Sequence, residues 1–519
     1  MVFILGLLRS TFDVLTPYVM SNFNKHALSA TTNIIANIVS GIIKLPYAKL
    51  LDCWGRPQGF TLIVLFTTLG TILMATCQNV AMYCAAQVFF YVGYYGIQFS
   101  LVLFIADSSP GKNRALMFGI IWSPSLISIW ASGPLATSIL KSLTFEWGFG
   151  ICCIVILVVC APVIALLFKF HGTESKSNAA QQPETERRLR STITYYLREF
   201  DVIGLLILST GLSLLILPLS IYSYQPDGWR SALVICFFLF GGLLVIAFAL
   251  YEAYLAPSSF LPWTLMKHPT VLWTNIMAAS LYTSEFISSA YIYSMLIVVF
   301  DQTTTQAAYI KNIYYIGSSF WTLVLGLALR YHGRIKIWTL VLGIPFFILG
   351  QGMMIAFKPS FTPLSLMIVC KILIAFGGGT MYPIEQMTLM AVSQKHTAAL
   401  LAVESVVVDI GKSAGSAIAT AIWTAMFRQK LSVYLPIDEQ DMVDKIYGSL
   451  DVQASYRPGS VARDAINHAY LDTQHLIFIV ATALLAVTWI SVTFWEDIDV
   501  TAEDEHEETE EDVQHRNEV

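Results

Sequence analysis

Apolar stretches of about 20 residues recur along nearly the whole chain, and their length limits the folds available to it. A helix needs about 20 residues to cross the roughly 30 Å hydrocarbon core of a bilayer. Of the 519 residues, 56% are hydrophobic and only 13% are charged, whereas a soluble domain has about 25% charged residues. The sequence therefore predicts an all-α polytopic membrane protein.

We predict about 14 transmembrane helices from these runs. They cover residues 2–20, 30–51, 60–78, 81–105, 115–139, 148–169, 201–220, 231–251, 271–299, 307–329, 336–356, 363–387, 398–424 and 474–495. The first run is short on its N-terminal side, so we expect the natural chain to begin further upstream. It also lacks the basic segment and the cleavage site of a signal peptide, so the first span is expected to target the chain itself.

The positions of lysine and arginine predict the orientation in the membrane. With both termini in the cytoplasm, the inner loops and the tail carry 16 of these residues and the short outer loops carry five. The predicted organisation is an N-terminal transmembrane half at 1–170, a basic cytoplasmic linker at 171–200, further transmembrane helices at 201–427, an extracytoplasmic loop at 428–473, a last helix at 474–495 and an acidic cytoplasmic tail at 496–519.

The tail and the cysteines suggest few specific contacts. The last 24 residues hold 12 acids and one arginine, and such a run is most simply a solvated tail, with docking or sorting as the alternative. All eight cysteines fall in predicted spans or in the loop after Asp52, so no disulfide framework is implied. No stretch has the spacing of protein metal ligands, and no resident cofactor or metal is expected.

One short connection, "AKLLDCWGRPQGF" at 48–60, places an acid, a base and a glycine between two apolar spans. Asp52 and Arg56 can clasp the ends of neighbouring helices, and Gly55 permits a tight turn. A clasp that forms in one conformation and opens in another is a gate. The alternative is that Arg56 anchors the helix at the membrane surface and Asp52 caps it. A later inner turn, "RYHGRIK" at 330–336, carries a similar device and suggests two pseudo-repeated halves.

The pattern from Ala48 to Arg56 resembles the G-x-x-x-D-x-x-G-R signature of the major facilitator superfamily, with Ala48 in place of the first glycine. Six stretches, in order along the chain, resemble one branch of that superfamily, the fungal siderophore–iron transporters. They are "SNFNKHALSATTNII" (21–35), "PYAKLLDCWGR" (46–56), "FDVIGLLIL" (200–208), "YEAYLAPSSFLPWTLMKHPTV" (251–271), "HTAALLAVESVVVDIGKSAGSAIATAIWTAMF" (396–427) and "AINHAYLDTQHLIFI" (465–479). The resemblance implies a major facilitator fold of the 14-span type.

The first span departs from that branch. Its members tend to carry an Asp and an Arg at fixed distances before the His of "KHAL", and this chain has Leu8 and Phe12 there. Arg9 and Asp13 lie nearby, one position later. We expect this departure to affect which substrate is chosen and how its transport is coupled, and altered or lost uptake is one outcome.

Ionisable residues inside a bilayer are costly and usually face a cavity or a partner. Asp409 and Lys412, at positions i and i+3, are expected to neutralise each other, and Arg9 and Asp13 invite the same interpretation. Glu285 has no cationic neighbour in its own span, and polar and aromatic residues flank it. The predicted proton-coupling candidates are Glu285, Glu404 and Asp13, with simple hydrogen-bonded burial as the alternative.

Aromatic residues predict a substrate cavity. In "FFYVGYYGIQFS" at 89–100, helical spacing lets Tyr91, Tyr95 and Gln98 share one face. With Tyr282 and Tyr291 from the ninth span they are the cavity candidates, against ordinary packing as the alternative. The outer loop supplies Tyr456, Arg463 and Tyr470 as candidates for capturing a ligand, unless the loop is only a lid.

No phosphate-binding loop occurs, since "GGGT" at 377–380 lacks the lysine, so an ion gradient is the expected energy source and the chain is not expected to be an enzyme. The resemblance implies a proton-coupled symporter that imports iron-loaded siderophores by alternating access. The alternatives are an exchanger or exporter of another solute, such as a glutathione-type anion, haem or a drug, and a non-transporting nutrient receptor. The expected partners are the siderophore, protons and the lipid bilayer, and no nucleic acid. The chain is expected to be a monomer. We expect it in the plasma membrane, with an endosomal or vacuolar membrane as the alternative.

Overall fold

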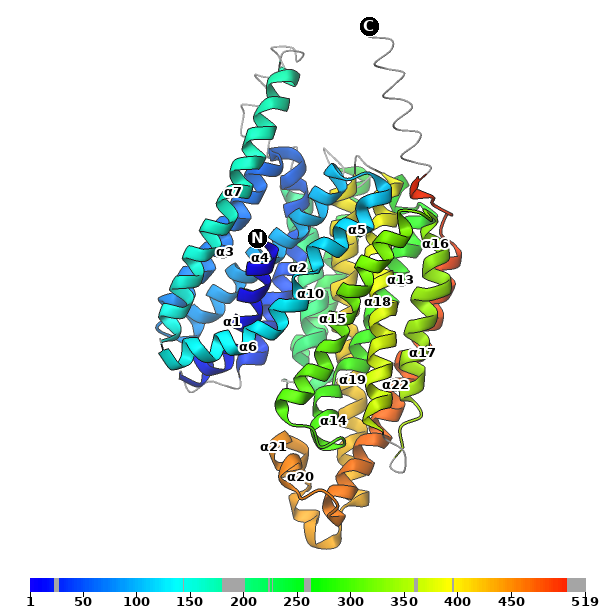
Figure 1. Cartoon of the computed structure of the whole chain (residues 1–519). Coiled ribbons are helices and arrows are strands. Elements are labelled where there is room, and N and C mark those ends of the chain that lie inside the picture. The colour runs from blue at the N-terminus through cyan, green and yellow to red at the C-terminus, as the bar shows by residue number, and fades with distance from the viewer. Residues whose placement is uncertain are drawn as a thin grey trace. The chain divides into compact units, whose positions relative to one another are not determined.

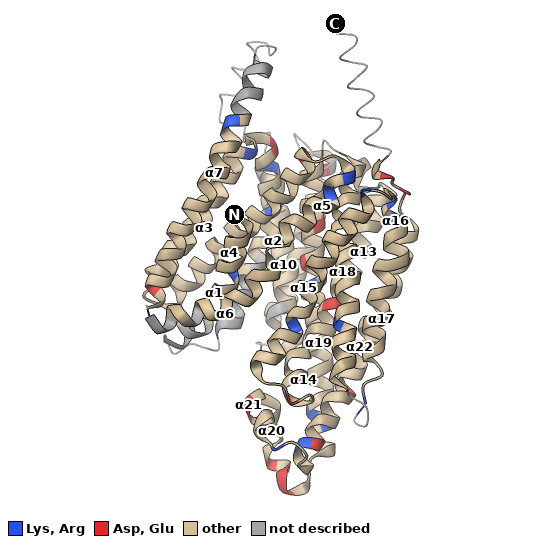
Figure 2. Cartoon of the chain, viewed as in Figure 1, with Lys and Arg blue, Asp and Glu red and all other residues tan. Residues whose placement is uncertain are grey.

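The helical class that the sequence predicts is confirmed by the computed structural model, which describes residues 1–22, 28–142, 144–179, 201–222, 225, 227–255, 263–358, 363–393 and 396–501 (Figure 1). Within these ranges the regular structure is helical, and an isolated β-bridge joins Arg334 to Asp499. Lys, Arg, Asp and Glu are sparse along the helices and gather near their ends (Figure 2). The predicted tail beyond Thr501 and residues 180–200 of the predicted linker lie outside the described residues.

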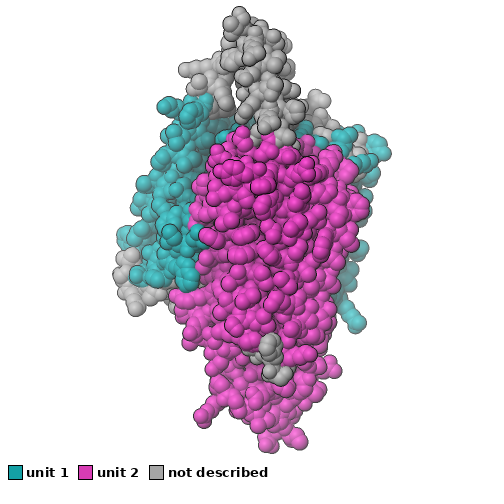
Figure 3. Space-filling model, turned by 45° about the vertical axis from the view of Figure 1, so that its right-hand side comes forward, with its two compact units in different colours: residues 1–108, 124–267, 393–409 teal, residues 109–123, 268–392, 410–519 magenta. Residues whose placement is uncertain are grey.

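The chain forms two compact units, which Figure 3 colours separately. Unit 1 comprises residues 1–108, 124–267 and 393–409, and unit 2 comprises residues 109–123, 268–392 and 410–519. Each unit is described below by itself.

Unit 1 contains the first four helices and several later ones. Its elements are α1 (Val2–Asn22), α2 (Leu28–Trp54), α3 (Arg56–Ala75), α4 (Val80–Ser108), α6 (Ser125–Ser142), α7 (Phe145–Ala179), α10 (Val202–Ile221), η2 (Gly228–Arg230), α11 (Ala232–Tyr254), α12 (Trp263–Met266) and the first part of α19 (Thr397–Tyr434). The α10–α11 pair is joined by Asp201, whose side chain accepts hydrogen bonds from Gly204 N at 3.4 Å and from the Tyr251 hydroxyl at 2.6 Å.

Unit 2 is built around the long helices α13, α15, α18 and α22. Helix α18 packs against both α15 and α13, and α22 packs against α13. Its elements are α5 (Gly111–Trp122), α13 (Pro269–Ser289), α14 (Ile292–Val298), α15 (Thr304–Leu329), α16 (Ile335–Trp338), η3 (Thr339–Gly343), α17 (Ile344–Met354), α18 (Leu364–Val392), the rest of α19, η4 (Ile437–Met442), α20 (Val443–Gly448), α21 (Leu450–Ser455) and α22 (Val461–Thr493).

Nine helices in the described part of the chain are long and apolar enough to cross a membrane, and α1 and α10 contain shorter apolar helices. Two predicted spans are broken. The span at 115–139 is two helices, α5 and α6, which meet at Pro124, a residue without an N–H for a helical hydrogen bond; Ser123 before it keeps right-handed helical backbone. The span at 271–299 is divided into α13 and α14 at Ala290–Tyr291. The count of 14 stays a prediction.

Helices α3 and α4 approach so closely that glycine is needed at their contact. A Cβ on Gly93 would lie 2.4 Å from the backbone nitrogen of Thr67, and one on Gly70 would lie 2.3 Å from the backbone nitrogen of Phe90. Such small residues let helix backbones pack together in a bilayer, where van der Waals contact rather than the hydrophobic effect joins them. By contrast, a Cβ on Gly242 in α11 would meet nothing within 4 Å.

We predict that Gly93→Ala destabilises unit 1 by about 1–3 kcal/mol through overpacking, because a backbone atom cannot move aside. The melting temperature of the purified protein measures this effect and should fall by several degrees. The matched variant Gly242→Ala fills open space and adds helix propensity, so its melting temperature should stay level or rise. Equal melting temperatures for the two variants would contradict the close α3–α4 contact.

Candidate functional site

The turn between α2 and α3 has a backbone conformation that glycine adopts readily and other residues do not. Gly55 has φ 103° and ψ 153°, a region that a Cβ disfavours. The turn places Arg56 at the start of α3, four residues after Asp52 near the end of α2. The glycine of the predicted gating motif therefore sets the geometry in which the acid and the base meet.

Arg56 binds two carboxylates at once. Its Nη1 donates to Asp52 Oδ1 at 3.0 Å, its Nε donates to Asp107 Oδ2 at 2.9 Å, and its Nη2 lies 3.5 Å from Asp107 Oδ1. Because Asp107 is near the end of α4, the guanidinium ties together the ends of α2, α3 and α4 within unit 1. Sequence reasoning missed Asp107, although an acid two residues beyond a predicted span was a usable signal. The gating role of Asp52, Gly55 and Arg56 stays a prediction.

The second inner turn, at 330–336, is held in another way. The backbone N–H of Val500 donates to the carbonyl of Gly333 at 3.1 Å, and Lys336 Nζ donates to the carbonyls of Thr493 at 2.9 Å and Trp495 at 2.5 Å. The chain that follows α22 thus closes on this turn within unit 2. The two turns share a glycine and basic residues but differ in what holds them.

Tyrosines and two cations lie together in unit 1. The rings of Tyr91 and Tyr95 in α4 stack with centroids 6.0 Å apart. The Arg9 guanidinium lies 4.3 Å from the centroid of Tyr91, and Lys44 Nζ lies 5.7 Å from that of Tyr95, distances at which a cation and a ring attract each other. Gln98 donates to the Tyr94 hydroxyl at 3.0 Å. The structure therefore brings together Tyr91 and Tyr95, as predicted from their spacing.

The altered first span is packed into the interior of unit 1. Phe12 is 3% exposed, and its ring lies 4.7 Å from that of Phe90 and 4.9 Å from that of Phe149, centroid to centroid. Leu8 is buried as well. Leu8 and Phe12, where the resemblance implies charged residues, are thus apolar packing positions in this chain, while Arg9 contacts an aromatic ring.

The remaining ionisable candidates of unit 1 are Asp13, Glu404 and Asp409. The side chain of Asp13 lies outside the described residues. Glu404 in α19 is 2% exposed. Asp409 Oδ2 lies 3.9 Å from Lys44 Nζ, an ion pair that joins α19 to α2. The predicted neutralisation of Asp409 by Lys412 stays a prediction, and Lys44 is a further cation beside Asp409.

Glu285 lies in a polar network within unit 2. The Tyr382 hydroxyl of α18 donates to Glu285 Oε2 at 2.9 Å, and the Tyr314 hydroxyl of α15 donates to that of Tyr382. Glu285 also interacts electrostatically with Lys412 and Lys371, the latter only 6% exposed. The cations that its own span lacks are therefore supplied by α19 and α18.

A proline inside the continuous helix α18 lies next to this network. Pro383 lies inside the helix and cannot donate to the carbonyl of Gly379, and the Thr322 hydroxyl donates to that carbonyl instead at 2.9 Å. A Cβ on Gly378 would lie 2.8 Å from the Tyr314 hydroxyl oxygen. The glycine and proline of "GGGTMYPIE" thus make room for the tyrosines and leave no backbone acceptor unpaired at this point.

Tyr282 is next to the same network, and Tyr291 is elsewhere. The Tyr282 hydroxyl donates to Glu385 Oε1 at 3.1 Å, and Lys412 Nζ lies 5.2 Å from the Tyr282 ring centroid. Tyr291 stacks on Trp423 with centroids 4.1 Å apart. The five predicted cavity residues are thus divided between unit 1 and two places in unit 2, and a shared cavity stays a prediction.

The predicted capture residues hold the outer segment together in this conformation. Arg463 is 2% exposed, and its Nη1 donates to the carbonyls of Gln453 at 2.7 Å and Tyr456 at 3.3 Å. Tyr470 donates to Gln453 Oε1 at 2.6 Å. Tyr456 donates to Glu439 at 2.9 Å, and burial together with this bond raises the pKa of Tyr456. Ligand capture by these residues stays a prediction, and for Arg463 and Tyr470 it requires the segment to open.

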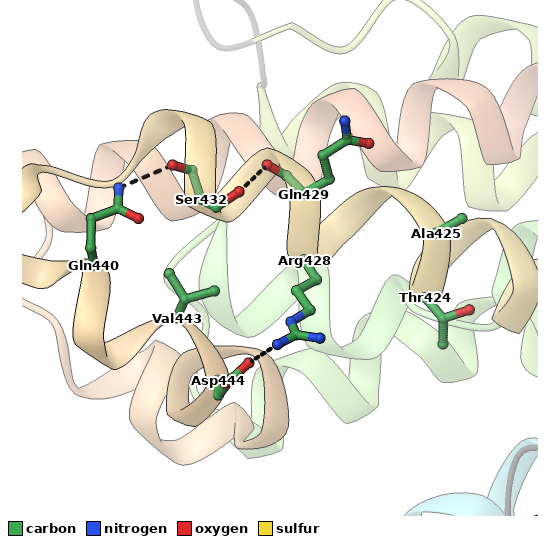
Figure 4. A pocket seen from close by; sticks show the side chains of 8 residues that line it. All are labelled: Thr424, Ala425, Arg428, Gln429, Ser432, Gln440, Val443 and Asp444. Carbon is green, nitrogen blue, oxygen red and sulfur yellow. Dashed lines mark hydrogen bonds and ion pairs between the residues drawn. The ribbon is translucent and has the colours of Figure 1, made fainter. Parts of the chain in front are cut away.

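A polar pocket of about 530 Å³ lies beside this segment (Figure 4). An ion pair crosses it, with Arg428 Nη2 2.7 Å from Asp444 Oδ1. Gln440 donates to the carbonyl of Ser432 at 3.0 Å. The sequence predicts a loop at 428–473, and within these bounds α19 continues to Tyr434 and α22 begins at Val461. Among the described residues, no group of three His, Cys, Asp or Glu side chains could hold a metal ion.

Comparisons with known proteins agree with this architecture. A sequence model described as Major Facilitator Superfamily matches residues 1–257. The crystal structure of the human organic anion transporter MFSD10 (TETRAN) superposes with a TM-score of 0.53 and covers 93% of this chain and 98% of its own at 12% identity. At that identity the likeness concerns the fold alone. The fold is that of a secondary transporter.

Comparison with curated relatives identifies the branch of the superfamily. The MFS siderochrome iron transporter 1 of Ajellomyces capsulatus is 46% identical over 488 residues, which are 94% of this chain and 83% of the relative. The MFS siderochrome iron transporter D of Aspergillus fumigatus is 34% identical over 96% of this chain and 83% of its own length. Siderophore iron transporter 1 of Schizosaccharomyces pombe is 32% identical over 92% and 78%. The chain belongs to the major facilitator superfamily, in its fungal siderophore–iron transporter branch.

We predict that Asp107→Asn lowers the initial rate of substrate uptake as much as Asp52→Asn does, by about fivefold. An exposed ion pair contributes up to about 1 kcal/mol, and both acids bind the same guanidinium. Uptake by cells with equal amounts of each variant at the membrane measures the effect. The matched control is Asp227→Asn, an exposed acid of unit 1. Normal uptake by Asp107→Asn would show that Asp107 has no part in the gate.

Proposed function

We propose that the chain imports ferric siderophore chelates by alternating access, coupled to protons. The observation that carries the proposal is the 46% identity to the siderochrome iron transporter of Ajellomyces capsulatus over 94% of the chain. The network around Glu285 adds a proton-binding group inside the helices. Import direction, proton coupling and a plasma-membrane location are parts of the proposal.

Glu285 has the properties that proton coupling requires. Its carboxylate is partly exposed and lies on a helix without other charges, between Tyr382, Lys371 and Lys412. Burial of a carboxyl group favours its protonated form, whereas nearby cations and a donated hydroxyl favour the ionised form. Opposed influences of this kind let a carboxyl group bind a proton from an acidic exterior and release it to a neutral interior.

Polar groups within each unit suit the proposed cargo. A ferric hydroxamate is bulky and presents many oxygen acceptors on its surface, and iron arrives already chelated. Tyrosine hydroxyls and the ammonium group of Lys412 in unit 2, and tyrosine hydroxyls, the Gln98 amide and the ammonium group of Lys44 in unit 1, are donors to such acceptors. We therefore keep Tyr91, Tyr95, Gln98, Tyr282 and Tyr291 as the proposed substrate contacts.

The first test is radiolabelled iron accumulation in fungal cells that lack their own siderophore transporters and express this chain. A panel of iron-loaded hydroxamates is supplied at acidic and at neutral external pH, with and without an uncoupler. We expect uptake that depends on the chelate, is faster at acidic pH and is lost with the uncoupler. No uptake of any chelate, with the protein present at the membrane, would contradict import.

We predict that Glu285→Gln removes the dependence of uptake on external pH and slows accumulation at least tenfold at acidic pH, because an amide cannot carry the coupled proton. The control is Asp441→Asn, an exposed acid of unit 2, which should behave as the unaltered chain. Glu285→Gln that keeps the full pH dependence would exclude Glu285 as the coupling group.

A further inference from the structure

The same four-residue pattern occurs on two neighbouring helices of unit 2. In α13 it is Tyr282-Thr283-Ser284-Glu285, and in α18 it is Tyr382-Pro383-Ile384-Glu385. Helical residues three positions apart lie on one face, so each helix presents a tyrosine and a glutamate together. The sequence analysis considered Glu285 and Tyr282 separately and gave Glu385 and Tyr382 no role.

The two pairs bind each other crosswise. The Tyr382 hydroxyl of α18 donates to Glu285 of α13 at 2.9 Å, and the Tyr282 hydroxyl of α13 donates to Glu385 of α18 at 3.1 Å. Between these bonds the two tyrosine rings stack, with centroids 4.9 Å apart and planes 27° apart. Each carboxyl group is thus held by a hydroxyl from the opposite helix. We call these four residues the reciprocal clamp.

The surroundings of the clamp limit what else can influence its charge. Helix α19 contributes Lys412, and α18 contributes Lys371. Helix α15 contributes Tyr314 and also Lys311, which acts electrostatically on Lys371. Helix α17 contains no acidic or basic residue, and α22 has none from 476 to 493; its acidic and basic residues are Arg463, Asp464, His468, Asp472 and His475. Glu385 is completely buried, and Glu285 is partly exposed. Lys412 and Lys371 are the cations that act on Glu285.

The strength of each crossed bond depends on the protonation of its carboxyl group. A hydroxyl that donates to an ionised carboxylate makes a charge-assisted hydrogen bond, roughly twice as strong as one between neutral groups. Both bonds join α13 to α18, so these helices are held most firmly when both carboxyl groups are ionised. Proton binding weakens the bonds and frees the two helices to change their contact.

We propose that the reciprocal clamp is the contact through which proton binding acts on the helices, with Glu385 as a second proton-binding group and Tyr282 and Tyr382 as positioning residues. The proposal rests on the proposed function in its link to transport. It assigns a role to all four residues of the clamp, because a carboxyl group without a bond to another helix would bind a proton with no direct effect on a helix contact.

The test is infrared difference spectroscopy of the purified full-length protein in lipid nanodiscs, titrated from acidic to neutral pH without substrate. The carbonyl stretch of a protonated carboxyl group reports each proton directly. We expect two titrating bands, one lost in Glu285→Gln and the other in Glu385→Gln. In Tyr382→Phe the midpoint of the Glu285 band should move up by about one pH unit, a tenfold change in proton affinity, since the ionised form loses its donor. Tyr282→Phe should move the Glu385 band in the same direction.

Phenylalanine keeps the ring and its stacking, so these variants should fold, which the melting temperature verifies. Tyr331→Phe, at a tyrosine of unit 2 that is 78% exposed, is the control and should leave both bands unchanged. Bands that titrate identically in the Tyr282→Phe, Tyr382→Phe and unaltered proteins would overturn the proposal, as would bands that neither glutamine variant removes. Shifted bands in a protein that takes up no ferric chelate would refute the proposed function and leave the clamp standing.

Discussion

Polar groups inside apolar helices must find partners within the protein, because a bilayer offers them no water, and this constraint organises unit 2. Glu285 and Glu385 each accept a hydrogen bond from a tyrosine of the other helix, and the carbonyl that Pro383 leaves without its helical donor accepts one from Thr322. An unsatisfied polar group in hydrocarbon costs several kcal/mol. The crossed bonds therefore determine which faces of α13 and α18 meet, and the glycines of α18 allow the rings to fit between them.

The ends of the helices follow another rule, since charged groups there remain accessible to water. Arg56, Asp52 and Asp107 form an exposed cluster whose energy is small. Small energies suit the proposed gating contact, which opens and closes as the conformation changes. The clamp inside the helices and the exposed cluster thus differ in kind: the first is proposed to respond to protons, and the second joins three helix ends.

Much of the fold was accessible from the sequence. Run length predicted the helical membrane class, and the positive φ of Gly55 explains why the gating motif requires glycine there. The break at Ser123–Pro124 was visible in principle, but two apolar runs that follow each other without a charge are read as one span. The helices within 428–473 were missed because short helices on a polar loop lack apolar periodicity.

The candidate site was predictable only in part, because partners across helices are not encoded in spacing. Glu285 stood out as an acid in an apolar span, but its donor Tyr382 lies 97 residues away. Asp409 was paired with the cation nearest in sequence, Lys412, and the structure adds Lys44 of another helix at 3.9 Å. Both contacts across helices depend on how the helices pack, which residue spacing does not encode.

Proton flux measured together with chelate flux tests the central claim, that protons bound within the helices drive the import of ferric siderophores. Proteoliposomes containing the purified chain and an internal pH indicator are given a transported ferric hydroxamate without any imposed gradient. The account predicts internal acidification that follows chelate entry in a fixed ratio and is absent in Glu285→Gln. Chelate entry without any movement of protons would contradict it.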